Sequence, residues 1–307
     1  MRVTNNMMID NMLMDLNNNL NRMMQTQKQM SSGVKFKAPS DDPIAVSRAL
    51  ILKSILHDNQ QYTKNAQDGV SWLDLTDTAL NQLTKDLQRV RELAVQGSNG
   101  TLSKEDSFSI AQEIQQIRDD MVKIGNTTYA GRYIFGGYNT QNPPLTVQPS
   151  DGTITYRGIN GGVTPQEIEF EVGQGISIPV NVEAYQVFGT RDSANGKNDI
   201  FTDLDNLIDA LNKGDTQAVS SMLGKIDDHL NNVLAVRADI GARQNRMQLI
   251  LDRLQDDNLN YTDLLSKTQD VDIAEISMKL ANDQNVYIAS LMLGSKIIMP
   301  TLVEFIR

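Results

Sequence analysis

The stretch SSGVKFKAPSDDP, Ser31–Pro43, marks both of its own ends and decides how the chain is organised. Ser32-Gly33 predicts a helix stop, because glycine commonly follows the last turn of a helix. Asp42 predicts a helix N-cap with Pro43 in the first turn, where a missing N–H costs nothing. The short basic segment between these signals therefore connects two separate helices. We expect linker and capping roles for Gly33, Lys35, Lys37, Asp41, Asp42 and Pro43.

The segment before this connection carries a heptad seam. Its spacing alternates between four and three residues, which places the side chains on one stripe of a helix. The polar positions are rich in asparagine, a poor helix former, so this helix should need partners to stay folded. The seam consists of Ile9, Leu13, Leu16, Leu20, Met23, Gln27 and Met30.

Methionine is concentrated at the same end, with eight of the 14 methionines in the first 30 residues. One interpretation is that they fill gaps in a core, because methionine is flexible. The other is an adaptable apolar surface that packs against more than one partner. Met8, Met12 and Met24 lie outside the seam and give the helix a second apolar flank. The matching pattern at the other terminus favours the interface.

Long helical patterns follow Pro43. One helix opens the segment, a break is expected near Asp68-Gly69, and a second helix closes at Ala94 before a turn at Gly97 to Gly100. A further helix predicted to end at Gly125 has Ile110, Ile114, Ile117, Met121 and Ile124 on one face.

The sequence pattern then changes from one typical of helices to one typical of strands. Residues 128–142 combine aromatics with glycine pairs, which predicts a β-hairpin. Residues 146–200 hold eight of the 20 glycines and carry seven acidic and three basic residues, with short alternating runs. We expect a small acidic β insert there.

Helical pattern returns near Phe201 and continues almost to the end, with a break predicted at Ser266 to Asp270. Within this region Gly241 is predicted to allow close approach of a neighbouring helix. The last helix has Ile273, Ile276, Leu280, Tyr287 and Leu291 on one face, and we expect these residues, with Ile9, Leu13, Leu16, Leu20, Met23 and Met30, to form an assembly interface.

The predicted fold is mainly α with a β insert: an elongated antiparallel coiled-coil hairpin of paired N- and C-terminal helices with a small β-rich outer domain. Three parts are expected. Residues 1–41 and 269–307 form a terminal coiled coil, 42–145 and 201–268 form a long-helix bundle with the hairpin, and 146–200 form the exposed insert. In an isolated monomer, 1–40 and 270–307 are expected to be disordered while 43–265 fold.

Composition narrows the function classes. The 307 residues carry a net charge of −10, which argues against a nucleic-acid partner. No stretch has the roughly 18 apolar residues of a membrane span, and the N-terminus does not resemble a Sec-type signal peptide. The absence of cysteine excludes disulfides and thiolate metal sites.

Motifs for chemistry are missing as well. His57 and His229 lie in long helices without metal-ligand spacing, and the adjacent carboxylates Asp119 and Asp120 point about 100° apart on a helix. We therefore expect no catalytic residue, no cofactor and no metal.

Five motifs in order resemble the axial proteins of the bacterial flagellum, the flagellin superfamily. They are the start MRVTNNM, Met30–Gly33, SDDP at Ser40–Pro43, RADIGARQNRMQ at Arg237–Gln248 and DVDIAE at Asp270–Glu275. Flagellins typically have Asp-Asp-Ala-Ala-Gly where this chain has DDPIA at 41–45, and they usually end in Leu-Leu-Arg where this chain ends EFIR. The hairpin sequence at Tyr129–Pro144 is similar to the hook–filament junction branch, hook-associated protein type 3. A minor flagellin is the alternative.

This resemblance implies a protein secreted unfolded through the flagellar type III apparatus, with an export chaperone as a partner. It implies self-assembly into a ring at the hook–filament junction of the extracellular flagellum, between the other hook-associated junction protein and flagellin. The terminal helices would form an inner tube, the long helices an outer tube, and the insert would face outward. A cytosolic coiled-coil scaffold would explain the heptads but not the order of motifs, and an enzyme would need a polar constellation that is not found.

Overall fold

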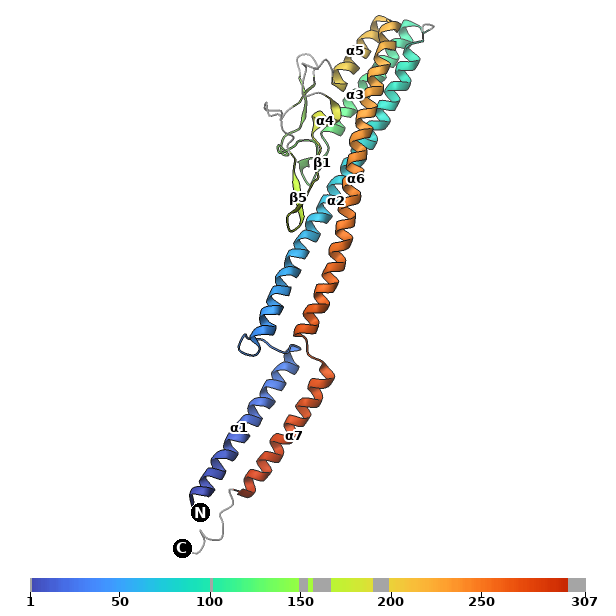
Figure 1. The fold of residues 1–307 in the computed structure, drawn as a ribbon. Helices are drawn as coiled ribbons and strands as arrows, with labels where there is room; N and C mark the ends of the chain where they lie inside the picture. The colour runs from blue at the N-terminus through green and yellow to red at the C-terminus, as the bar shows by residue number, and fades with distance from the viewer. Residues whose placement is uncertain (1, 100–101, 149–153, 157–166, 190–198, 298–307) are drawn as a thin grey trace. The chain divides into compact units, whose positions relative to one another are not determined.

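The computed structural model describes residues 2–99, 102–148, 154–156, 167–189 and 199–297 (Figure 1). The chain divides into two compact units, Met1–Asp58 with Asp257–Arg307, and Asn59–Asp256. Two long helices, α2 (Pro43–Gly97) and α6 (Thr216–Gln269), run through both units. The predicted tail residues 304–307 lie outside the described residues.

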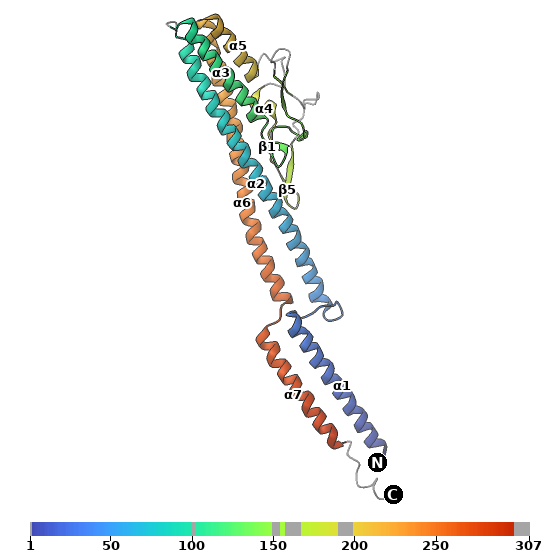
Figure 2. The same cartoon turned by 180° about the vertical axis from the view of Figure 1, so that it is seen from behind.

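The first unit contains the terminal helices α1 (Arg2–Ser32) and α7 (Ile273–Ile297), which lie side by side in both views (Figures 1 and 2). They are joined to α2 and α6 by the short segments 33–42 and 270–272. The predicted helix stop at Gly33, the start at Pro43 and the break near Asp270 are confirmed.

The second unit is a helical bundle with small β elements packed on it. α3 (Lys104–Gly125) and α5 (Ile200–Lys213) pack together beside α2 and α6. Arg237 of α6 donates to Asp77 of α2 at 2.7 Å, which ties the two long helices together. The face predicted for α3 is confirmed, with Ile110, Ile114 and Met121 buried.

The β part consists of three antiparallel pairs in the described residues. They are β1 (Thr128–Tyr129) with β2 (Arg132–Tyr133), β3 (Leu145–Val147) with β4 (Ile154–Tyr156), and β5 (Glu169–Gly173) with β6 (Ile176–Pro179). The short helix α4 (Ala184–Phe188) follows. The predicted hairpin is present as β1–β2, and the described part of 146–200 contains strands as expected.

These β elements share one hydrophobic core with the helices. Val172, Ile178 and Phe188 are buried in the same cluster as Trp72 and Leu83 of α2. The three-part division expected from the sequence is a finer division than these two units, and it remains a proposal about the assembled protein. The expected disorder of the terminal segments in an isolated monomer likewise remains a prediction.

One predicted break is wrong, because α2 is continuous through Asp68-Gly69. A glycine inside a helix costs about 1 kcal/mol relative to alanine. Here Gly69 is buried, and a Cβ at this position would lie 2.7 Å from Met247 and 3.4 Å from Phe170. The glycine therefore lets α6 and β5 pack closely on α2, and this packing outweighs the weak helix propensity.

The prediction for Gly241 is wrong within this chain. A Cβ at Gly241 would meet nothing within 4 Å, so no neighbouring helix of the chain approaches it. At Gly125, in contrast, a Cβ would clash with Leu145 and lie 3.1 Å from the Phe188 ring, and both side chains are fully buried.

These two glycines form a matched pair of substitutions. We expect Gly125→Ala to lower the free energy of unfolding by about 1–3 kcal/mol, because the buried neighbours must move. Gly241→Ala should raise it by about 0.5–1 kcal/mol through helix propensity alone. Urea unfolding followed by fluorescence of Trp72, the single tryptophan, reports on both. A stabilising Gly125→Ala would contradict this packing.

Candidate assembly interface

The terminal helices α1 and α7 meet along a stripe that is partly polar. Thr26 Oγ1 donates to Asp283 Oδ2 at 2.8 Å, and both residues are buried. Asn19 Nδ2 donates to Ser290 Oγ at 3.0 Å. A third contact is steric, since a Cβ on Gly294 would overlap the Met12 side chain. The terminal methyl group and sulfur of Met12 therefore pack directly on Gly294 of α7.

The contact stripe of α1 is rotated about the helix axis relative to the predicted seam. In the structure, the contact stripe of α1 consists of Ile9, Met12, Leu16, Asn19, Met23 and Thr26. Of these, the predicted seam residues Ile9, Leu16 and Met23 are half-buried. Leu20 is also half-buried. Leu13, Gln27 and Met30 are exposed, so these seam residues do not lie within the pair.

The stripe of α7 shows the same mixture. Ile276 is buried, and Leu280 and Tyr287 are half-buried, as expected for residues on the contact face. Ile273 and Leu291 are 56% and 44% exposed. The predicted interface residues thus fall into two sets, those inside the pair and those on its outer surface.

The buried carboxylate of Asp283 fixes how the two helices align. Besides the hydrogen bond from Thr26, it forms an ion pair with Arg22, with 3.2 Å between Nε and Oδ1. Sliding one helix by a turn would separate Asp283 from both donors and leave a buried charge uncompensated, which is strongly destabilising. A single polar seam position is known to specify register in coiled coils in this way.

The outer surface of the terminal helices carries many large apolar side chains among its polar ones. Methionine and leucine side chains on α1 and branched or sulfur-containing side chains on α7 are exposed to solvent. Large exposed apolar side chains of this kind are typical of surfaces that take part in protein–protein contacts. They are Met7, Met8, Leu13, Met14, Met24 and Met30 on α1, and Ile273, Met278, Ile288, Leu291, Met292 and Leu293 on α7.

The connection from α1 to α2 is fixed at both ends. Gly33 has φ +70°, a left-handed conformation that favours glycine, and its N–H donates to Gln29 O at 2.9 Å. Asp42 Oδ1 accepts from the N–H groups of Ile44 and Ala45 at 3.1 and 2.9 Å. Asp42 is therefore the N-cap of α2.

The two connections in the first unit are bonded to each other. Lys35 N donates to Gln269 O at 2.7 Å, and Val271 N donates to Gly33 O at 3.0 Å. These bonds form an isolated antiparallel bridge between Val34 and Asp270. Segments 33–42 and 270–272 are therefore held as a pair, although each was expected only as a linker.

Asp41 closes a turn within the first connection. Its Oδ2 accepts from Lys37 N at 3.0 Å and Ala38 N at 3.1 Å. These two hydrogen bonds lower the pKa of the Asp41 carboxyl below its ordinary value of 3.8, and the charge of Lys28 adds a smaller effect. The carboxylate form therefore holds the turn.

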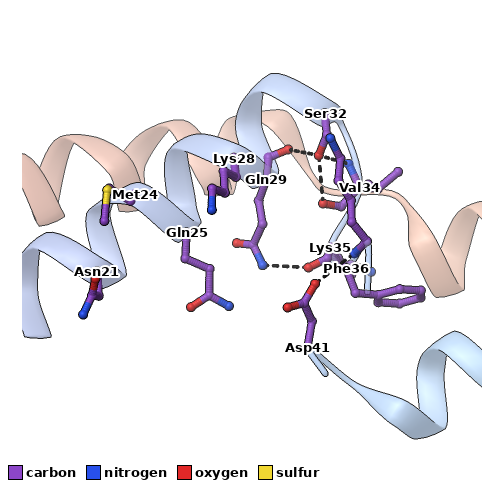
Figure 3. A pocket seen from close by; sticks show the side chains of 11 residues that line it. Asn21, Met24, Gln25, Lys28, Gln29, Ser32, Val34, Lys35, Phe36 and Asp41 are labelled. Carbon is purple, nitrogen blue, oxygen red and sulfur yellow. Dashed lines mark hydrogen bonds between the residues drawn. The ribbon is translucent and has the colours of Figure 1, made fainter. Parts of the chain in front are cut away.

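A basic groove lies between the end of α1 and this turn (Figure 3). Lys28, Lys35 and Lys37 line it together with the apolar Met24 and Phe36. Lys35 Nζ donates to Lys267 O at 3.1 Å, and Gln29 Nε2 donates to Lys35 O at 2.7 Å across the groove wall. We call this surface the lysine groove.

The polar seam residues Asn19, Thr26, Asp283 and Ser290 were missed because the seam was selected by apolar character. Their signal in the sequence of α1 was a second set of positions at heptad spacing, Met12, Asn19 and Thr26. Each of them comes one residue before a predicted seam position. No group of three or more His, Cys, Asp or Glu in the described part of the chain could hold a metal ion. No described helix is long and apolar enough to cross a membrane.

Removal of the Asp283 carboxylate tests the register. We expect Asp283→Ala to lower the free energy of separating α1 from α7 by about 1–3 kcal/mol, because the buried Thr26 hydroxyl loses its acceptor and Arg22 loses its ion pair. Thr26→Val with Asp283→Leu should recover most of this loss, since both partners become apolar. Hydrogen exchange of α1 amides measures both effects, with exposed Asp263→Ala as the control. Unchanged α1 exchange in Asp283→Ala would show that the pair does not depend on this contact.

The turn at Asp41 should depend on pH. Because its folded-state pKa is depressed, its hydrogen bonds are present above the ordinary pKa and are lost as the pH falls through the folded-state value. NMR titration should show the amide signals of Lys37 and Ala38 moving with a midpoint below 3.8, and Asp41→Asn should abolish the movement. A midpoint at or above 3.8 would contradict the two hydrogen bonds.

Comparison with known proteins places these features in a family. Residues 3–140 match the bacterial flagellin N-terminal helical region, and residues 223–299 match the bacterial flagellin C-terminal helical region. A putative flagellar hook-associated protein from Vibrio parahaemolyticus has the same fold, with a TM-score of 0.66 at 24% identity over 75% of this chain and 100% of that one. FlgL from Bacillus cereus aligns with a TM-score of 0.58 at 23% identity, over 70% of this chain and 99% of that one.

The relatives that align with most of the chain include hook-associated proteins and a flagellin. Flagellar hook-associated protein 3 of Escherichia coli is 31% identical over 291 residues, covering 89% of each chain. The protein of the same name from Salmonella typhimurium is 30% identical with the same coverage. Flagellin of Bacillus subtilis is 28% identical over 282 residues, covering 90% of this chain and 89% of the flagellin. Identity at this level over nearly the whole length shows that the chain belongs to the flagellar hook-associated protein 3 family.

Proposed function

We propose that this chain is a structural subunit of the extracellular bacterial flagellum, where copies form the junction ring between hook and filament. The relatives that carry the family are named hook-associated proteins. The observation that carries the proposal here is the exposed apolar outer surface of α1 and α7. A ring of copies would cover this surface.

The energetics favour assembly through these helices. Burying one Leu or Met side chain is worth roughly 1.5–3 kcal/mol, so covering several of them stabilises an assembly substantially. Within the single chain, the α1–α7 contact stripe uses polar pairs at several of its positions. The assembly therefore supplies the apolar burial that the two-helix pair lacks.

The partners follow from this position in the flagellum. On the hook side the ring contacts the other hook-associated junction protein, and on the filament side it contacts flagellin. An export chaperone holds the chain before the flagellar type III apparatus secretes it. The terminal coiled coil lines the inner tube, the long helices form the outer tube, and residues 146–200 face outward.

The role is mechanical rather than catalytic. Described pairs such as His229 with Asp203 at 2.9 Å lie within the helical bundle, where Lys225 Nζ also donates to Asp203 at 2.9 Å. These contacts join α5 to α6 and account for the buried carboxylate structurally. Neither nucleic acid nor a membrane is part of the proposed function.

Electron microscopy of isolated flagella tests the location. Gold-labelled antibodies against the chain should mark a narrow band at the hook–filament boundary, one band per flagellum. Label spread along the filament would instead identify a minor flagellin. Absence of label from hook and filament would refute both.

Charged substitutions on the outer surface test the assembly mode. We expect Leu13→Glu or Leu291→Glu to remove the band from most flagella, because burying an unpaired carboxylate in an interface is costly. Gln115→Glu, exposed on α3 away from the terminal helices, should assemble normally. The midpoint of urea unfolding followed by Trp72 should be unchanged in all three. Normal assembly of both leucine variants would exclude this surface as the interface.

A further inference from the structure

We infer that α2 of one copy of this chain packs along α6 of the next copy, with a basic stripe on α2 facing an acidic stripe on α6. The inference rests on the proposed function, because it names the contact that joins neighbouring copies in the ring. Both stripes lie on the long helices, so the proposed function places them in the same outer tube. The contact is separate from the apolar outer surface of α1 and α7.

One row of exposed side chains on α2 is basic. Its positions are alternately three and four residues apart, which places them on one stripe of the helix. The stripe contains two lysines and no carboxylate, and neither lysine forms an ion pair within the described part of the chain. Asn65 and Gly69, which contact β5, lie off this stripe. The basic stripe consists of Leu50, Lys53, His57, Gln60 and Lys64, all of them exposed.

A row with the same spacing on α6 is acidic. It contains three carboxylates and no cation. Leu249 and Leu259 are 71% and 70% exposed, so two large apolar side chains lie among these carboxylates. Exposed apolar side chains at coiled-coil spacing favour pairing with another helix, and the charges favour a basic one. The acidic stripe consists of Leu249, Asp252, Asp256, Leu259 and Asp263, all of them exposed.

The carboxylates of the acidic stripe have room for a further partner. Asp252 Oδ1 accepts from Gln248 Nε2 at 3.0 Å, and Asp263 Oδ2 pairs with Lys267 Nζ at 2.6 Å, both within α6. Asp256 forms no ion pair with a described residue. A carboxylate has two oxygens and about four lone-pair sites, so an ammonium group from another copy can bind without displacing these contacts.

The two stripes match position by position along the helices. α2 and α6 lie side by side and run antiparallel with the same rise per residue (Figures 1 and 2). Leu52 and Leu264 line one groove, and Gly69 lies against Met247, so these positions are level with each other. Counting along both helices from these two contacts gives the further level pairs. They are Lys53 with Asp263, His57 with Leu259, Gln60 with Asp256, and Lys64 with Asp252.

This match makes a second copy the occupant of each stripe. Within one chain the stripes cannot meet, because α2 and α6 contact each other through other positions and both stripes are exposed. A second copy placed beside the first, with no shift along the helices, brings α2 of one against α6 of the other. Both lysines then face carboxylates, the Gln60 amide can donate to Asp256, and the His57 ring covers Leu259.

The contact would be heterologous, because the two stripes are different surfaces of the same chain. Each copy then offers one basic edge and one acidic edge, and a row of copies keeps a free stripe at either end. Such rows close into rings when the rotation between copies allows it. Copies that are level with each other form a ring rather than a stack, which suits the proposed junction.

Thiol cross-linking tests the contact directly, because the native chain contains no cysteine. Packed helices lie about 8–10 Å apart, so a short bismaleimide suits them better than a disulfide. Full-length Gln60→Cys and Asp256→Cys chains are produced together and cross-linked, both in isolated flagella and as purified protein. We expect cross-linked dimers. Leu249→Cys, two helical turns away on the same stripe, should give several-fold less product than Asp256→Cys, and Gln115→Cys on α3 should give none.

Charge reversal tests the chemistry of the contact. Adding Lys53→Glu and Lys64→Glu to both cross-linking partners should lower the dimer yield by about tenfold, because two exposed ion pairs become contacts between like charges. Adding Asp252→Lys and Asp263→Lys to the same chains restores opposite charges in every contact and should restore the yield. Lys85→Glu with Lys104→Glu changes the net charge equally at exposed lysines outside the stripe and should have no effect. Circular dichroism checks that each variant is folded.

The outcomes separate this inference from the proposed function. Dimers that depend on charge and are restored by the second reversal support the paired stripes. An absence of dimers in flagella that carry the antibody band would overturn the paired stripes while the junction role stands. Dimers of purified chains without any band at the junction would overturn the proposed function instead.

Three further results would also overturn the paired stripes. One is a dimer yield that ignores the charge reversal. Another is equal product from Leu249→Cys and Asp256→Cys, because the level alignment would then be wrong. The third is a product in flagella that joins one copy to a different protein instead of a second copy.

Discussion

Two helices packed side by side can bury only one face each, and this constraint governs the terminal pair. α1 and α7 use their contact stripe for polar pairs and a close approach at Gly294. Large apolar side chains are left on the outer surface. The second unit does not meet this limit, because α2, α3, α4, α5 and α6 enclose a common core with the β pairs. The chain thus combines a unit that completes its own core with a pair of helices that leaves large apolar side chains exposed.

The sequence predicted the helices well because their periodicity and their ends are local properties. Gly33, Asp42 and Pro43 stop and start helices through backbone conformation and capping, so they needed no tertiary information. The seam of α1 was predicted less well. Apolar character favoured Leu13 and Leu20 over the neighbouring Asn19 and Thr26. The polar positions make the contact because Ser290 and Asp283 lie opposite them, more than 250 residues away in the chain.

Glycine shows the same limit of local reasoning. Gly69 was expected to break a helix and Gly241 to admit a neighbour, but the close contacts occur at Gly69 and Gly125. Helix propensity is a property of one residue. Whether a glycine permits close packing depends on which element of the fold lies opposite it. The bond between the two connections, Val34 with Asp270, likewise could not be predicted, because each segment alone resembles an ordinary linker.

The polar contacts between α1 and α7 have a consequence for the order in which the chain unfolds. When the two helices separate, Asn19, Thr26, Asp283 and Ser290 exchange their mutual hydrogen bonds for bonds to water, so little free energy is lost. A stripe of leucines would resist the same separation much more strongly. Under a pulling force the terminal helices should therefore separate before the helical bundle of the second unit unfolds.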